Sequence, residues 1–193
     1  MNKKITVTTF TDPMMGLSWE CEPIFRKLET HFAGQIAFRT VMALLVRNVR
    51  DFMTPDELAL EPGEGIRRYN ARLAKIYESE EPISGMPINM TDFRLFSAER
   101  PSSLPLNLAY HAAKLTDAES TERFLYNLRY ATVVDCRPTT QTEELLAVVQ
   151  NTGLNADTFL RHFRDGSAEA ALEQDLRVWR GIGVHSLPVQ MRR

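Results

Sequence analysis

Cysteine is scarce in this chain, whose 193 residues include only Cys21 and Cys136. Two thiols so far apart in the sequence form neither a disulfide framework nor a zinc-binding pattern. The histidines also lack metal-ligand spacing, both with one another and with the cysteines. They are His31, His111, His162 and His185. We therefore expect reduced thiols and no metal site.

Long hydrophobic runs are missing as well. The longest, residues 41–46, is far shorter than the roughly 20 residues that a membrane-spanning helix needs. The N-terminal lysines are not followed by the apolar segment of a secretory signal peptide. A net charge of -2 gives no excess of basic residues for nucleic acid or an anionic membrane. We expect a cytosolic protein with neither nucleic acid nor membrane as partner.

The first 50 residues carry a strand, a helix and a second strand. Residues 4–10 alternate and are rich in β-branched side chains, which predicts a strand. Apolar residues recur at helical spacing over 15–32, and Gly34 ends that helix. Residues 35–46 become nearly continuously apolar, which is typical of a strand covered on both faces. This order predicts a βαβ unit with parallel strands.

The rest of the chain is mostly helical in pattern. Helices are expected at 63–79, 101–115, 118–134, 140–151, 155–164 and 167–180. Glycine and proline separate several of these stretches. The closing segment, GIGVHSLPVQMRR, predicts a glycine-rich turn and then a third strand introduced by Pro188.

Three stretches together resemble the DsbA-like branch of the thioredoxin superfamily, in particular its cytosolic, FrnE-like members. They are TDPMMGLSW at 11–19, the helical stretch 131–163 and GIGVHSLP at 181–188. The resemblance implies an α/β thioredoxin-like fold whose core, residues 1–50 and 181–193, carries an all-helical insertion over 51–180. It also implies a cis peptide bond before Pro188. Members of this family are thiol-disulfide oxidoreductases and protein-disulfide isomerases.

The active-site motif of that family is altered here. The family places Cys-x-x-Cys-Trp after Asp-Pro-x, whereas this chain reads Met15-Gly16-Leu17-Ser18-Trp19. A methionine thioether has no proton to lose, and a serine hydroxyl cannot resolve a mixed disulfide as a thiol does. Met15 and Ser18 therefore mark a degenerate catalytic site. The residues expected to contact a ligand around it are Asp12, Trp19, His185, Leu187 and Pro188.

Several functions remain open at this point. One is a binding module that pairs an extended peptide with the backbone of Leu187, with Met15, Ser18 and Trp19 lining the groove. Another is a glutathione-dependent enzyme similar to kappa-class glutathione transferases and 2-hydroxychromene-2-carboxylate isomerases. In that case Ser18 would orient the sulfur of glutathione or another small thiol. A third is residual thiol chemistry at Cys21, one turn beyond Ser18.

The C-terminus is short for this fold. Only five residues follow Pro188, so the sheet would be incomplete and its last strand would present an unpaired edge. Three interpretations are open: a fragment, a truncated reading frame, or a protomer completed by a partner, for example in a homo-oligomer formed through this edge.

Overall fold

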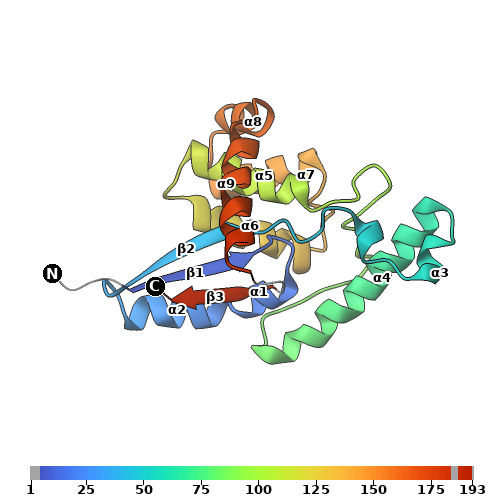
Figure 1. Cartoon of the computed structure of the whole chain (residues 1–193), viewed down its shortest axis with the longest axis horizontal. Helices are drawn as coiled ribbons and strands as arrows, with labels where there is room; N and C mark the ends of the chain where they lie inside the picture. The colour runs from blue at the N-terminus through green and yellow to red at the C-terminus, as the bar shows by residue number, and fades with distance from the viewer. Residues whose placement is uncertain (1–4, 184–186, 193) are drawn as a thin grey trace.

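The computed structural model describes residues 5–183 and 187–192, and its strands form a three-stranded sheet of order β2-β1-β3 on one side of the molecule (Figure 1). Strand β1 (Ile5–Thr11) runs parallel to β2 (Ile36–Met42) and antiparallel to β3 (Val189–Arg192). The parallel register pairs Thr11 with Met42, so both strands end beside each other. The predicted βαβ unit and the third strand after Pro188 are confirmed.

The helix predicted over 15–32 is divided in two. Helix α1 (Gly16–Glu20) ends at Cys21, and α2 (Glu22–His31) begins immediately after it. Pro23 has no N–H to donate to the carbonyl of Trp19, and its ring crowds that carbonyl, which interrupts the helix. Helix α2 then lies along the sheet, where the rings of Phe25 and Phe38 are 5.9 Å apart.

The second strand ends at Met42, earlier than the predicted residue 46. Leu44 has a φ of 48°, a left-handed conformation that ends an extended run. The next two N–H groups donate to side chains instead of the sheet: Leu45 to Asp12 and Val46 to Ser103. Residues 41–46 are all apolar, but only the first two of them belong to the strand.

The helical region contains the predicted helices with shifted ends. Its helices are α3 (Pro55–Leu58), α4 (Pro62–Glu80), α5 (Leu104–Thr116), α6 (Thr121–Val133), α7 (Thr142–Thr152), α8 (Ala156–Arg164) and α9 (Ser167–Gly181). Two short 3-10 turns, Val49–Asp51 and Glu81–Ile83, flank the α3–α4 segment. Helix α3, which the sequence pattern did not predict, is a single turn stabilised by a capping box between Thr54 and Glu57.

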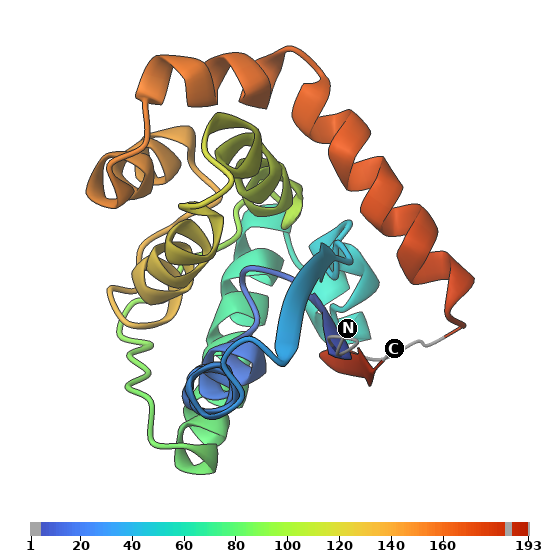
Figure 2. The ribbon, with the colours of Figure 1, turned by 90° about the vertical axis from the view of Figure 1, so that its left-hand side faces the viewer.

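Helix α9 returns the chain from the helical region to the sheet, as Figure 2 shows. It packs against β2, where Asp175 Oδ2 accepts a hydrogen bond of 2.8 Å from the N–H of Met42. The ring of Trp179 also lies 5.6 Å from that of Phe10 in β1. These contacts place the C-terminal end of the helical region directly on the sheet.

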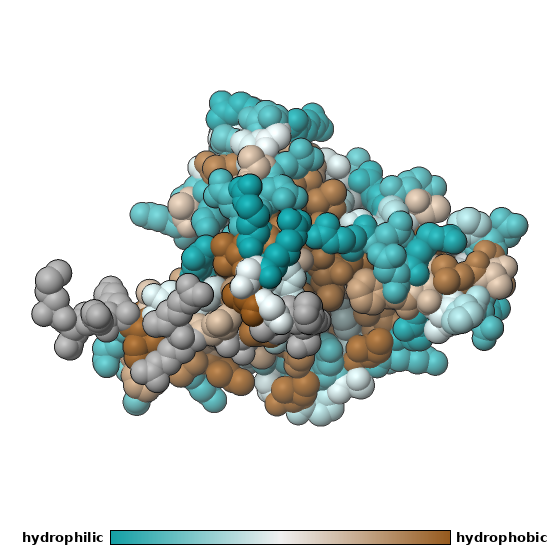
Figure 3. Space-filling view, viewed as in Figure 1, coloured by the Kyte–Doolittle hydropathy of each residue, from teal (hydrophilic) through white to brown (hydrophobic). Residues whose placement is uncertain are grey.

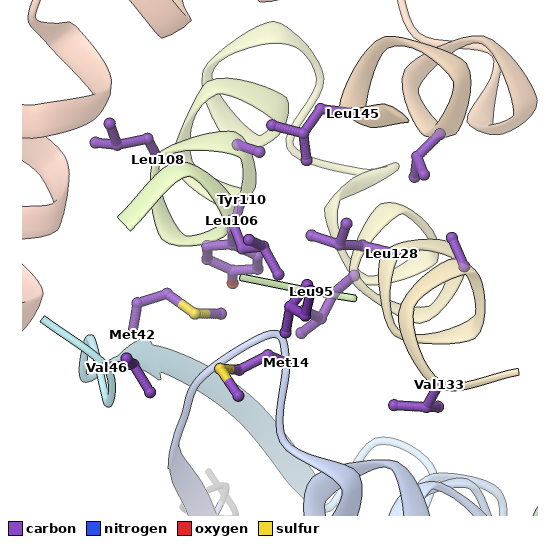
Figure 4. Close-up of a cluster of buried hydrophobic side chains, with 14 of the residues drawn as sticks. Met14, Met42, Val46, Leu95, Leu106, Leu108, Tyr110, Leu128, Val133 and Leu145 are labelled. Atoms are coloured by element: carbon purple, nitrogen blue, oxygen red, sulfur yellow. The ribbon is translucent and has the colours of Figure 1, made fainter. Parts of the chain in front are cut away.

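One continuous hydrophobic cluster joins the sheet to the helices (Figure 4). Met14 and Met42 extend from the strand ends towards Leu106, Tyr110 and Leu128 of α5 and α6. Because this core is shared, the division into residues 1–50 with 181–193 and residues 51–180 stays a prediction. Within the described ranges, no helix is both long and apolar enough to span a bilayer.

Candidate functional site

The segment between β1 and α1 is fixed by Asp12, whose side chain is completely buried. Its Oδ2 accepts hydrogen bonds from the Leu45 N–H, Ser103 Oγ and Asn107 Nδ2 at 2.9, 2.7 and 2.8 Å. Its Oδ1 accepts one of 3.2 Å from the Met14 N–H. Burial raises the pKa of Asp12, and these donors oppose that shift. The structure thus places the predicted ligand residue Asp12 inside the protein, as an anchor of the strand-to-helix junction.

Trp19 is also an interior residue, with no exposed surface. Its indole N–H donates to the carbonyl of Pro87 at 3.1 Å, and the rings of Tyr126 and Tyr130 lie 5.1 and 6.0 Å away. All of its polar and aromatic contacts are therefore made within the chain. It fills the space between α1 and α6 and does not wall a groove.

Ser18 is 2% exposed, and its hydroxyl lies 4.0 Å from Met15 Sδ. Its hydroxyl lies 2.7 Å from Thr11 Oγ1, which accepts a hydrogen bond of 3.1 Å from Arg129. Arg129 in turn donates to Glu22 at 2.7 Å. The hydroxyl is thus engaged in an internal polar chain. The structure does not bring Ser18 to the cavity that Met15 lines.

That cavity, which we name the junction pocket, has a volume of about 220 Å³. It lies between the start of α1, one face of α4 and Leu187. The residues that define it here are Met15, Gly16, Leu17, Ile76, Tyr77, Glu80 and Leu187. The Tyr77 hydroxyl donates to the carbonyl of Met14, which holds α4 against the junction. Apart from Glu80 and Arg72, the wall is mostly apolar.

Met15 and Leu187 are the predicted site residues that the fold brings together. The peptide bond between Leu187 and Pro188 is cis, and Pro188 is half-buried before β3. His185 lies outside the described residues. The wall contributed by α4 was missed by sequence reasoning, although Tyr69, Leu73, Ile76 and Tyr77 form an apolar stripe at helical spacing. The stripe predicts that this face of α4 is covered, but it does not predict which part of the chain covers it.

Neither cysteine is placed for redox chemistry at the junction pocket. Cys21 stands between α1 and α2, and Cys136 follows α6; both are free and lie away from the pocket lining. Burial raises the pKa of the Cys21 thiol, and the charge of Arg129 opposes this only in part. Burial also raises the pKa of Cys136. Both thiols therefore stay protonated at neutral pH and are weak nucleophiles.

Comparison with known proteins agrees with this architecture. A sequence model described as thioredoxin matches residues 8–191. The chain belongs to the thioredoxin family. This chain is also similar to a curated protein, the ClpXP adapter protein SpxH of Shouchella clausii, with 27% identity over 189 residues, which cover 96% of this chain and 57% of that protein. The chain thus spans little more than half the length of this relative.

Solved thioredoxin-family structures show the same fold. A proposed protein disulfide isomerase from Nitrosomonas europaea has a TM-score of 0.78 at 14% identity, with 99% of this chain and 85% of that chain covered. The cytosolic disulfide reductase DsbM from Pseudomonas aeruginosa, solved with GSH, has a TM-score of 0.68 at 19% identity, covering 96% and 84%. The predicted fold class, an α/β thioredoxin-like fold with a helical insertion, is confirmed.

Proposed function

We propose that this chain is a protein-binding module that holds a peptide segment of a partner protein in the junction pocket, without disulfide cycling. The observation that carries the proposal is the pocket itself. It is an apolar cavity at the β1–α1 junction, walled by Met15, α4 and Leu187, and none of its described lining residues is a cysteine. Such a cavity suits apolar side chains better than it suits thiol exchange.

The residues at the junction support the loss of redox activity. By the resemblance of TDPMMGLSW to the DsbA-like motif, Met15 and Ser18 stand where that family has its cysteines. The Met15 thioether cannot form a thiolate, and the Ser18 hydroxyl is buried against Thr11. Cys21 is the nearest thiol in the sequence, and its pKa is raised. The chain therefore retains the scaffold of an oxidoreductase without a nucleophile in the pocket.

The surface around the pocket supports a peptide as ligand. Ile76 is 44% exposed and Phe52 is 43% exposed, and both line the pocket. Figure 3 shows hydrophobic side chains reaching the surface on the α4 side of the molecule. Exposed apolar residues gathered at a cavity mark binding surfaces more often than isolated ones do. The curated relative is named as an adapter for ClpXP. By extension, we propose that the bound segment belongs to a protein presented to a protease of that kind.

The glutathione-dependent alternative is not favoured by this geometry. It requires a hydroxyl that orients the sulfur, but the Ser18 hydroxyl is 2.7 Å from Thr11 Oγ1 and does not line the pocket. The similarity to DsbM solved with GSH is a similarity of fold. We expect glutathione to give no saturable rise in melting temperature, because a ligand that binds the native state must stabilise it.

A matched pair of variants tests the proposal. Ile76→Asp places a charge in the pocket wall, whereas Ile24→Asp places the same charge on α2, at a residue that is 52% exposed and away from the pocket. Binding would be measured on an array of random peptides. For the peptides that the wild type binds, we expect Ile76→Asp to weaken binding by about tenfold or more. Ile24→Asp should bind as the wild type does. Equal binding by all three proteins would overturn the proposal.

A further inference from the structure

The junction pocket contains a charge that the chain leaves unpaired. Two charged side chains line it, Arg72 and Glu80. Arg72 is engaged by Glu57 through two hydrogen bonds of 3.0 and 2.9 Å. Glu80 has no ion pair among the described residues, and its buried Oε2 receives no hydrogen bond from them. The pocket is therefore mostly apolar, with one paired charge at Arg72 and one Glu80 carboxyl oxygen that lacks a donor in the described part of the chain.

A second carboxyl group, from Glu20 of α1, reinforces the negative character of this region. Glu20 is completely buried, and its Oε2 accepts a hydrogen bond of 3.0 Å from the Ser84 N–H. Its Oε1 has no partner among the described residues. Buried oxygens without donors are unfavourable and uncommon in native proteins. Glu20 does not line the junction pocket, so Glu80 is the acid that the donor of a bound ligand would reach.

The position of the Glu80 carboxyl depends on Gly16. A Cβ atom at residue 16 would overlap Glu80 Oε2, and it would come within 3.1 Å of the Tyr77 ring. A larger residue at position 16 would displace the Glu80 carboxyl group from this place at the first turn of α1. The carboxyl group therefore lies against Gly16, in the wall of the pocket that Met15 also lines.

We propose that the segment bound in the junction pocket carries a basic side chain, lysine or arginine, whose nitrogen donates to the Glu80 carboxylate while adjacent apolar side chains fill the pocket. This inference rests on the proposed function and specifies its ligand class. The aliphatic stem of a lysine or arginine suits an apolar wall, and its charged end needs an acceptor. The lining of Met15, Ile76 and Leu187 with Glu80 provides both.

Other ligand chemistries fit less well. An anionic ligand would face Glu80 and Glu20, and the cation that could receive it, Arg72, is already paired with Glu57. A wholly apolar ligand would leave Glu80 Oε2 buried without a donor. Burial and the charge of Glu20 raise the pKa of Glu80 to about 7. The neighbouring Tyr77 hydroxyl stays neutral, since burial raises its pKa, and its proton is donated to the Met14 carbonyl. A bound cation would supply the donor and favour the ionised carboxylate.

The first experiment uses a small probe that does not depend on peptide binding. Methyl signals of Met14 and Met15 would be followed by NMR during titration with hexylammonium chloride and with 1-hexanol, its neutral counterpart. We expect the wild type to bind hexylammonium about tenfold tighter than hexanol, as suits a charged hydrogen bond in a partly enclosed site. Glu80→Gln should lose this preference. Glu78→Gln, with the same change at an exposed residue of α4, should keep it.

Equal affinity for the two probes in the wild type, or an unchanged preference in Glu80→Gln, would overturn the inference. The second experiment uses apolar peptides with a single lysine and the same peptides with norleucine in its place. A lysine preference that disappears in Glu80→Gln supports the inference. Peptides that bind without such a preference overturn the inference and leave the proposed function standing. Amine preference without binding of any peptide overturns the proposed function and leaves Glu80 as a cation site.

Discussion

Two carboxyl groups lie at opposite ends of the β1–α1 junction, one completely buried (Asp12) and one half-buried (Glu80), and they differ in what surrounds them. Burial raises the pKa of both Asp12 and Glu80. Asp12 receives hydrogen bonds from Leu45, Ser103 and Asn107 as well as Met14. Glu80 Oε2 receives none from the described residues. The same chemical group is part of the architecture where the chain supplies its donors, and a site for a ligand where the chain does not.

The largest effect is expected when the satisfied carboxyl is removed. Asp12→Ala leaves the Leu45 N–H, Ser103 hydroxyl and Asn107 amide buried without their acceptor. We expect the free energy of unfolding to fall by about 3–5 kcal/mol, measured by urea denaturation. Glu78→Ala, at an exposed position of α4, should change it by less than about 0.5 kcal/mol. Similar losses in the two variants would show that the Asp12 network does not hold the junction.

The next effect concerns Tyr77, which connects the two ends. Burial raises the pKa of Tyr77, the charges of Asp12 and Glu80 raise it further, and its hydroxyl donates to the Met14 carbonyl. Tyr77→Phe removes that donor and should lower the free energy of unfolding by about 1–3 kcal/mol. Thermal unfolding monitored by circular dichroism would measure the loss. Because Glu80 keeps its place against Gly16, the variant should still prefer hexylammonium to hexanol.

A smaller effect is expected from the pH dependence of stability, which tests Glu80 alone. Its pKa is raised from 4.5 to about 7, so in this range the native state binds more protons at Glu80 than the unfolded state does. The stabilisation from the protonated group is fully present below about pH 4.5 and is lost as pH rises through about 7. Subtracting the stability curve of Glu80→Gln from that of the wild type should show this decline. A flat difference would mean that the native carboxyl titrates as an exposed glutamate does.

The smallest effect is expected from Cys21→Ser. Cys21 is only partly buried and its thiol is protonated at neutral pH, so it contributes packing and no chemistry. We expect a change in stability below about 1 kcal/mol and unchanged binding of hexylammonium. A fluorescent peptide disulfide supplied with reductant should be turned over by neither protein. Turnover by the wild type that disappears in Cys21→Ser would show that Cys21 carries out thiol-disulfide exchange.

Some features of the site follow directly from the amino-acid sequence. The identity of residues 15 and 18 rules out dithiol chemistry at those positions, whatever the fold around them. Hydrophobic periodicity predicts the βαβ unit and the long helices, because helices and strands bury one face at fixed intervals. Pro188 before the last strand and Pro23 within the first helix act through the backbone. Their effects are local and can therefore be predicted from the sequence.

Other features depend on contacts between residues far apart in the chain. Ser18 lies against Thr11, whereas Met15 lines the junction pocket. Ser18 and Met15 are nevertheless only one helical turn apart. Glu80 reaches Gly16 across more than sixty residues of sequence. Packing of the whole core decides which side of a short helix is buried. It also decides which distant carboxyl group lies against that helix. The sequence by itself determined the family and the missing thiols, and only the tertiary structure decided which side chains share the pocket.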